Sequence, residues 1–234
     1  IDLLFFDHWI VDAEGRVLFE ETSATSARFG RRRLPYGIVD KFLSVTVEKQ
    51  PVSMNSAVYR RTAIRSLPAW SDPAVGRWAD YPLNAQLAIK GCVAFYVPLR
   101  LGYYRRHSAA GTERVGEKAR EQEYLSSEAH ICQDLLDNPL PSQTRSFLEN
   151  RRWNSLRHLV HAYLLDGEVG KACELLEQLS DANVARIRPV DWIAKFLKFF
   201  EGWPLLFEPL HKVLVAAVSV RSRILTWQSR SPAL

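Results

Sequence analysis

The sequence predicts an α/β region over residues 1–112, a mixed sheet with flanking helices, followed by an all-α region over residues 113–234. In the first region, short apolar runs bounded by turn residues indicate buried strands. Beyond residue 113, apolar residues recur at helical spacing instead. The composition, with 47% apolar and 24% charged residues, is that of a globular protein, and it excludes a disordered chain, a collagen and a disulfide scaffold.

The first segment predicts a β-hairpin over residues 3–20. Leu3–Phe6 is a continuous apolar run of the kind found in strands buried on both faces. Ala13–Arg16 reads as a turn, because Gly15 adopts a positive φ easily. Val17–Phe19 then resumes an extended pattern.

The segment 20–50 is polar and predicts a loop with one helix near Ile38–Val45. A second helix is expected to start around Arg61–Ser66. The clearest helix of this region is Trp78–Lys90, which has apolar residues at helical spacing and Gly91 directly after it as a C-terminal signal.

Two extended runs complete the α/β region. Val93–Val97 predicts a strand that ends at Pro98, because proline cannot donate to a sheet ladder. Leu101–His107 predicts a separate strand, and a small polar loop follows it.

The second region predicts a long polar helix over residues 113–136, an amphipathic pair over 153–164 and 169–179 that turns at Gly167, and further helices ending in 210–227. The pair resembles one tetratricopeptide hairpin, but such repeats need about three units to be stable alone. A helical cap packed on the first region is therefore the favoured interpretation.

The net charge of +5 lies entirely in the first region. Residues 1–112 hold 15 basic and 10 acidic residues, whereas residues 113–234 hold 16 of each. The basic residues are not interleaved with aromatic ones in any nucleic-acid-binding motif, so we expect no nucleic-acid partner. A basic cleft for sugar phosphates or diphosphates fits the same electrostatics better.

The three cysteines are far apart in the sequence and form no zinc or disulfide pattern, which favours a reducing, cytoplasmic location. The longest uncharged apolar run near the C-terminus, Val213–Val220, has eight residues, and a bilayer crossing needs about twenty. The N-terminus does not read as a signal peptide. The chain opens inside a strand pattern without Met, so we expect it to be part of a longer protein.

Four polar features are candidates for chemistry: the pair Asp7-His8, the run Arg31–Arg33, Asp80 and His107. Asp80 lies at the predicted start of a helix, where a carboxylate also serves as a simple cap. His107 follows two arginines at the end of a strand. That arrangement suits a phosphate or a metal–diphosphate site, although a lone histidine is more often structural.

Several motifs occur together in a fixed order in the first region: DLLFFDHWIVDAEGR, SMNSAVYRR, W-x-D-Y-x-L with Q-x-A-x-x-G, and L-x-Y-Y-R-x-H. In this order, residues 1–112 resemble the C-terminal half of a family 2 glycosyltransferase with the GT-A fold. The resemblance implies a partial GT-A domain on the acceptor side over residues 1–112 and a helical extension over residues 113–234.

The resemblance also implies roles for particular residues. Asp80 would be the general base. His107 would contact a divalent metal, Mn or Mg, or the donor diphosphate. The residues that would bind substrate are Ser53, Met54, Asn55, Trp78, Tyr81 and Arg105.

The implied reaction transfers a sugar, with inversion, from a nucleotide-diphosphate sugar to a hydroxyl of a saccharide or lipid-linked acceptor, in glycan or cell-surface polysaccharide biosynthesis. The Q-x-x-R-W signature of processive synthases is absent from the sequence, so we expect a non-processive enzyme. The nucleotide-binding half and its Asp-x-Asp metal motif would precede residue 1. This chain alone is therefore expected to be inactive.

Two other interpretations remain open. A tetratricopeptide-like interaction module without catalysis would use a groove lined by residues 151–200. Peripheral membrane contact through a basic amphipathic helix at 210–227 is compatible with the transferase, and would place it at the inner face of the membrane.

Overall fold

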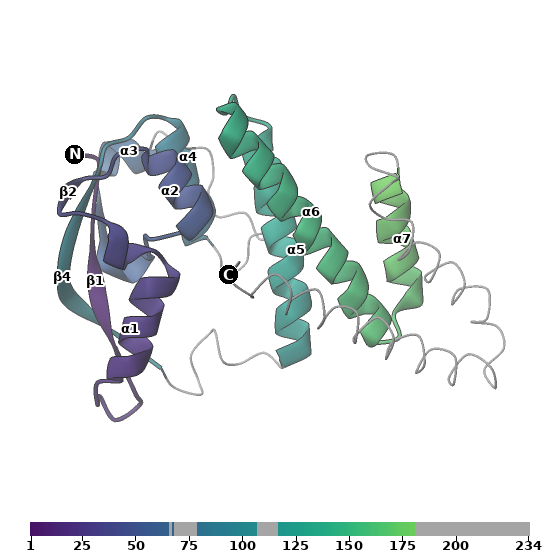
Figure 1. The fold of residues 1–234 in the computed structure, drawn as a ribbon, viewed down its shortest axis with the longest axis horizontal. Coiled ribbons are helices and arrows are strands. Elements are labelled where there is room, and N and C mark those ends of the chain that lie inside the picture. The colour runs from purple at the N-terminus through teal and green to yellow at the C-terminus, as the bar shows by residue number, and fades with distance from the viewer. Residues whose placement is uncertain (66, 68–78, 107–116, 181–234) are drawn as a thin grey trace, which may run out of the picture. The chain divides into compact units, whose positions relative to one another are not determined.

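A computed structural model of the chain describes residues 1–65, 67, 79–106 and 117–180. The chain divides into two compact units, Ile1–Ser155 and Leu156–Leu234, which are described separately. The first unit holds a four-stranded mixed sheet with helices packed against it, as the sequence predicts (Figure 1).

The sheet has the strand order β2-β4-β1-β3. Its two central strands, β1 (Leu3–Val11) and β4 (Ala94–Arg105), are parallel. The short edge strands, β2 (Gly37–Ile38) and β3 (Ala57–Tyr59), each pair antiparallel with their neighbour.

The helices follow in chain order. The first unit contains α1 (Phe19–Arg28), η1 (Arg31–Arg33), α2 (Phe42–Lys49), η2 (Met54–Ser56), α3 (Arg61–Arg65), α4 (Asp80–Ile89), α5 (Glu117–Leu136) and the first part of α6 (Ser142–Leu165). The second unit contains the rest of α6 and α7 (Val169–Ser180).

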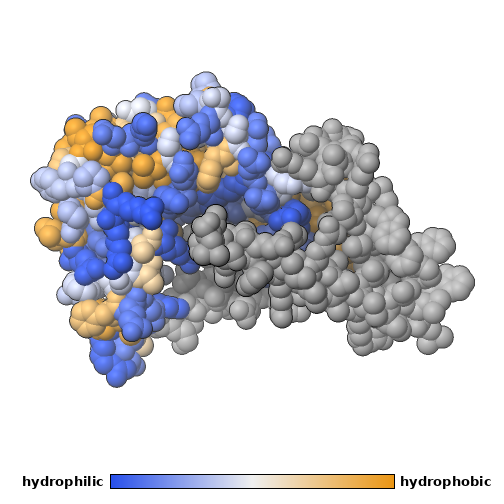
Figure 2. Space-filling view, in the orientation of Figure 1, coloured by the Kyte–Doolittle hydropathy of each residue, from blue (hydrophilic) through white to orange (hydrophobic). Residues whose placement is uncertain are grey.

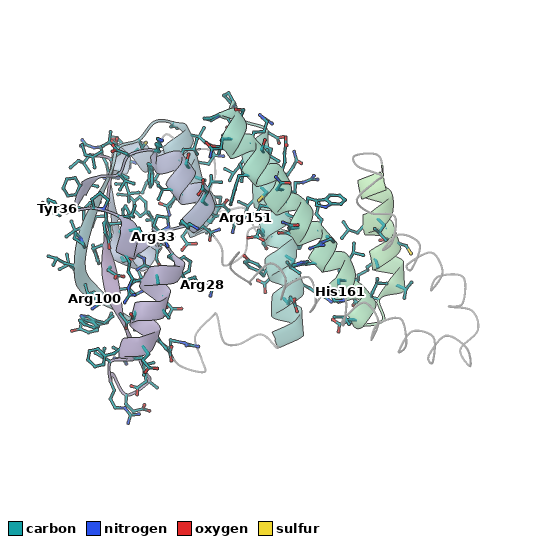
Figure 3. The ribbon with its side chains drawn as sticks, viewed as in Figure 1. Arg28, Arg33, Tyr36, Arg100, Arg151 and His161 are labelled. Carbon is teal, nitrogen blue, oxygen red and sulfur yellow. The ribbon has the colours of Figure 1, made fainter. Side chains whose placement is uncertain are left out.

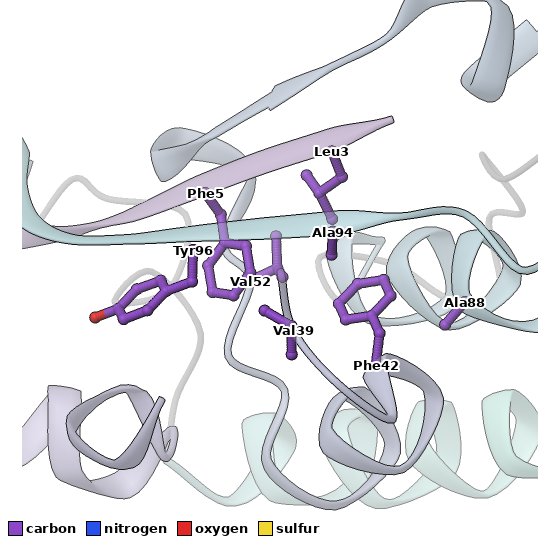
Figure 4. Close-up of a cluster of buried hydrophobic side chains, with 8 residues drawn as sticks. All are labelled: Leu3, Phe5, Val39, Phe42, Val52, Ala88, Ala94 and Tyr96. Atoms are coloured by element: carbon purple, nitrogen blue, oxygen red, sulfur yellow. The ribbon is translucent and has the colours of Figure 1, made fainter. Parts of the chain in front are cut away.

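One face of the sheet forms the main core. Alternate residues of the central strands, Leu3 and Phe5 of β1 with Ala94 and Tyr96 of β4, are buried on this face. They pack against apolar side chains from the helical side, as Figure 4 shows: Val39, Phe42, Val52 and Ala88. A second buried cluster joins α2 and α4 to α5 and the start of α6: Val47, Tyr81, Ala85, Ile131, Cys132, Leu135 and Leu148.

The opposite face of the sheet is more exposed. Leu4 of β1 is the cross-strand partner of both Val58 and Phe95, and Phe95 is the partner of Ile38, so these side chains share a face. Ile38 is 59% exposed and Val58 is 61% exposed. In Figure 2, hydrophobic side chains accordingly reach the surface on the sheet-bearing side of the described chain.

The predicted hairpin over residues 3–20 is wrong in its second half. The turn forms, but Val17 makes only an isolated bridge to Val11, and α1 begins at Phe19. The Oγ1 of Thr22 accepts a hydrogen bond from the Ile10 amide and donates one to the Leu18 carbonyl, which fixes the first turn of α1 against β1. Short apolar runs do not distinguish a strand from a helix start.

The expected loop over residues 20–50 is also wrong in part. It contains α1 and η1 before the edge strand β2, and the helix expected near Ile38–Val45 begins at Phe42. Ile38 itself belongs to β2. The helices at 61–66 and 78–90 are confirmed within the described residues as α3 and α4.

Pro98 does not end a strand, so the prediction of two separate strands is wrong. Val97 pairs with Phe6, whereas the next paired residue, Arg100, stands opposite Asp7, and β4 continues to Arg105. Pro98 and Leu99 therefore form an irregularity with no partner in β1. A bulge is a place where a strand tolerates proline, because no ladder hydrogen bond is needed from it.

The helical pattern of the second region is confirmed over the described residues. α5 covers the predicted long helix from Glu117 onward, and α6 and α7 cover the amphipathic pair. Gly167 turns the chain with φ +77°. The predicted boundary at residue 112, the helices after residue 189 and the segment 210–227 lie outside the described residues. No helix of the described part has the length and apolar character to cross a bilayer.

Candidate functional site

Asp80 is the first residue of α4, and it is half-buried. Burial raises the pKa of its carboxyl, although the backbone N–H groups of Tyr81 and of Asp80 itself oppose the rise. A carboxylate with a raised pKa is a better proton acceptor near neutral pH. The direction of this shift is the one that a general base needs, and the assignment of Asp80 as that base stays a prediction.

Asn84 connects this helix start to two other segments. Its side chain is 1% exposed. Its Oδ1 accepts a hydrogen bond of 3.1 Å from the Tyr59 hydroxyl at the end of β3. Its Nδ2 donates to the carbonyl of Asp80 at 2.6 Å and to that of Val52 at 3.5 Å.

The predicted substrate segment Ser53–Asn55 begins directly after Val52. Ser53 Oγ donates to Asn55 Oδ1 at 2.5 Å, and Met54 and Asn55 are exposed. This segment crosses close to the bulged part of β4, because a Cβ built on Gly102 would lie 3.9 Å from the Asn55 carbonyl oxygen. Through Asn84, the fold brings this segment close to the start of α4.

Tyr81 lies in the core rather than on the surface. It is 4% exposed, and the guanidinium of Arg151 from α6 lies 5.2 Å from the centroid of its ring. Figure 3 labels Arg151 on α6. The burial gives no support to the predicted contact between Tyr81 and substrate, which stays a prediction.

Arg105 is exposed and ends β4, opposite Val11 of β1. His107 and Trp78, the other residues assigned by the resemblance, lie outside the described residues. Within the described ranges, no group of three or more His, Cys, Asp or Glu side chains is arranged to hold a metal ion.

A second polar cluster lies where β1 and β4 lose their regular register. Asp7 and Arg31, which are 7% and 2% exposed, form an ion pair of 2.7 Å. Ser26 Oγ donates to the other carboxylate oxygen at 2.5 Å, and Arg100 approaches the same oxygen to 3.8 Å. The sequence indicated Asp7-His8 and Arg31–Arg33 as separate features, and the fold joins them.

His8 completes this cluster as a neutral group. Burial and the neighbouring charge of Arg31 lower the pKa of its imidazole to about 4, although the charge of Asp7 opposes them. The Nδ1 of His8 lies 3.2 Å from an Arg31 nitrogen. A neutral imidazole accepts that hydrogen bond, which makes His8 a structural partner of Arg31 at neutral pH.

Sequence reasoning missed Tyr59, Asn84, Ser26 and Arg100. Each is a common residue type to which no motif assigned a role, and each has a partner at least 19 residues away in the sequence. Asn84 stands four residues after Asp80 on the same helix face, and this spacing is the one local signal that linked it to the site.

Comparisons with protein-family models, curated proteins and solved structures find no match to this chain. The glycosyltransferase resemblance therefore depends on the order of its motifs.

Proposed function

We propose that residues 1–112 are the acceptor-side half of an inverting, non-processive glycosyltransferase with the GT-A fold. The supporting observation is the environment of Asp80. It is a half-buried carboxylate with a raised pKa, at a helix start that Asn84 ties to the segment preceding Ser53–Asn55. The donor would be a nucleotide-diphosphate sugar, and the acceptor a saccharide or lipid-linked hydroxyl.

The chemistry needs two kinds of group. A base must take the proton from the attacking acceptor hydroxyl, and Asp80 has that role in the proposal. The departing nucleoside diphosphate needs positive charge, which a divalent Mn or Mg ion would supply when bound. His107 is the proposed contact of that metal or of the diphosphate. The remaining ligands of the metal would come from outside the described ranges.

The charge distribution supports an anionic donor. The net charge of +5 lies within residues 1–112. Arg105, exposed at the end of β4, stands two residues before His107 and would contact the donor phosphates. A cytoplasmic enzyme at the inner face of the membrane would have access to both nucleotide sugars and lipid-linked acceptors.

Replacing the proposed base tests this function. Asp80→Asn keeps the shape and the helix position but cannot accept a proton, so kcat in the intact parent protein should fall by about a hundredfold or more. Affinity for the nucleotide-sugar donor should stay unchanged. The assay measures nucleoside diphosphate release over a panel of UDP-, GDP- and TDP-sugars.

Asp40→Asn is the matched control, because Asp40 is an exposed carboxylate of the same unit. It should leave kcat unchanged. If a folded Asp80→Asn protein turned over within about threefold of the wild type, Asp80 would be only a helix cap and the proposal would fail.

A further inference from the structure

We propose that Tyr59 and Asn84 form a positioning clamp that holds the first turn of α4, and with it Asp80, against the backbone that leads into Ser53–Asn55. This inference rests on the proposed function. It adds two residues that touch neither metal nor donor and that act through Asp80.

The clamp joins three segments that are separate in the sequence. Tyr59 ends β3, Val52 precedes η2 and Asp80 starts α4, and Asn84 makes one hydrogen bond to each. Both polar atoms of the Asn84 side-chain amide therefore have partners. Oδ1 accepts from the Tyr59 hydroxyl, and Nδ2 donates to the carbonyls of Val52 and Asp80. The orientation of the amide is fixed by the two carbonyls, which can only accept and therefore face Nδ2, so that Oδ1 is left to accept from the Tyr59 hydroxyl.

Burial makes this arrangement rigid. Asn84 is 1% exposed. If its amide lost a hydrogen-bond partner, the unsatisfied group would stay buried without compensation for its lost hydration, which would destabilise the folded state. Tyr59 is held in its neutral form, because burial and the negative charge of Asp80 both raise its pKa, although the bond to Asn84 opposes them. The phenol therefore remains a hydrogen-bond donor over the whole working pH range.

The consequence for catalysis is geometric. A general base works only within hydrogen-bond distance of the proton that it removes, and small displacements lower the rate sharply. If Ser53–Asn55 contacts the acceptor, its distance from Asp80 is set by the Val52–Asn84–Asp80 connection. Loss of the clamp should therefore lower kcat more than it weakens substrate binding.

Tyr59 belongs to β3, and it is a titratable group whose pKa is raised by the charge of Asp80 on α4. The charged Arg151 of α6 lies over the ring of the neighbouring Tyr81. Without the clamp, water would reach the first turn of α4 more easily, and the pKa of Asp80 should fall back toward its usual range because its rise is due to burial.

Two variants test the clamp. Tyr59→Phe removes only the hydroxyl, and Asn84→Leu removes the amide at similar volume. In this chain, the carboxyl pKa of Asp80, measured by carbon NMR titration, should fall in both. In the intact parent, kcat should fall about tenfold with KM little changed, and the acid limb of the pH–rate profile should move to lower pH. If Asn84→Leu does not fold, Tyr59→Phe decides alone.

Lys90→Gln is the control, because Lys90 is exposed directly after the same helix and belongs to no part of the clamp; it should alter neither quantity. If Tyr59→Phe leaves both the pKa of Asp80 and kcat unchanged while Asp80→Asn is inactive, the clamp is wrong and the proposed function stands. If Asp80→Asn remains active, the proposed function is wrong, and the positioning role is lost with it.

Discussion

His8 shows how burial turns a histidine into a pH-sensitive element of stability. The pKa of its imidazole is lowered to about 4, because burial and the charge of Arg31 disfavour the protonated form. In the unfolded chain the same group titrates near its ordinary value of 6.5. Between these values the unfolded state binds a proton that the folded state does not bind, so the free energy of unfolding falls as the pH falls.

The expected loss from His8 begins near pH 6.5 and is complete below about pH 4, and by pH 5 it amounts to about 2 kcal/mol. Urea unfolding at pH 7 and pH 5 measures it. His8→Gln should lose less stability than the wild type over this interval by that amount. An identical pH dependence of stability in His8→Gln and the wild type would contradict the prediction.

At the scale of elements, a half-buried ion pair connects three helices. Arg151 of α6 donates to Glu128 of α5 at 2.9 and 2.6 Å, and to the Val47 carbonyl of α2 at 2.8 Å. Burial alone would raise the pKa of Glu128, but Arg151 and the hydrogen bonds of Ser155 and Tyr124 lower it. The pair therefore stays charged at neutral pH and fixes α6 to the rest of the first unit.

Arg151→Met should lower the free energy of unfolding by about 2 kcal/mol, because it leaves the half-buried, charged Glu128 without its partner. The double variant with Glu128→Gln should regain part of this loss, since no unpaired, half-buried charge then remains. Arg157→Met, at an exposed position of the same helix, should change stability by less than about 0.5 kcal/mol. Urea denaturation curves of the four proteins decide whether the pair stabilises the helices.

Gly91 is the element-scale case in which the sequence signal and the structure agree. It follows α4 with φ +75°, and a Cβ there would meet no atom within 4 Å. A side chain at this position would therefore destabilise the fold only through the strain of a positive φ, because it would clash with no neighbouring atom. Gly91→Ala should destabilise the protein by about 1 kcal/mol, and Gly91→Asn by less.

Gly170→Ala provides the opposite case. Gly170 lies in the first turn of α7 without a positive φ, so alanine should stabilise the helix by up to about 0.5 kcal/mol. Thermal unfolding followed by circular dichroism measures both effects, the expected fall in melting temperature for Gly91→Ala and the expected rise for Gly170→Ala. Equal effects of the two substitutions would show that the left-handed backbone at Gly91 is not what matters.

At the scale of the whole molecule, the two apolar clusters formed by described residues of the first unit are complete by Leu148. A chain shortened to residues 1–165, which keeps all of α6, should therefore unfold cooperatively in urea at the same midpoint as the first unit of the full chain. Circular dichroism and tryptophan fluorescence should report coincident transitions. A broad transition without a native baseline would show that residues beyond 165 are needed for folding.

The sequence alone determined the features that depend on neighbouring residues. It predicted α4 with Asp80 at its start and Gly91 after its end, the apolar central strands, and helices over residues 117–136, 153–164 and 169–179. Capping, helical periodicity and continuous apolar runs involve residues a few positions apart, so they can be read without knowing the fold.

The tertiary structure alone decided which distant residues meet. It joined Arg31 to Asp7, Tyr59 to Asn84 and Arg151 to Glu128. It also made β4 one strand across Pro98, because the parallel partner β1 supports a bulge there that local sequence does not show. These contacts follow from strand order and helix packing, which are set by burying many side chains at once, and no short stretch of sequence contains that information.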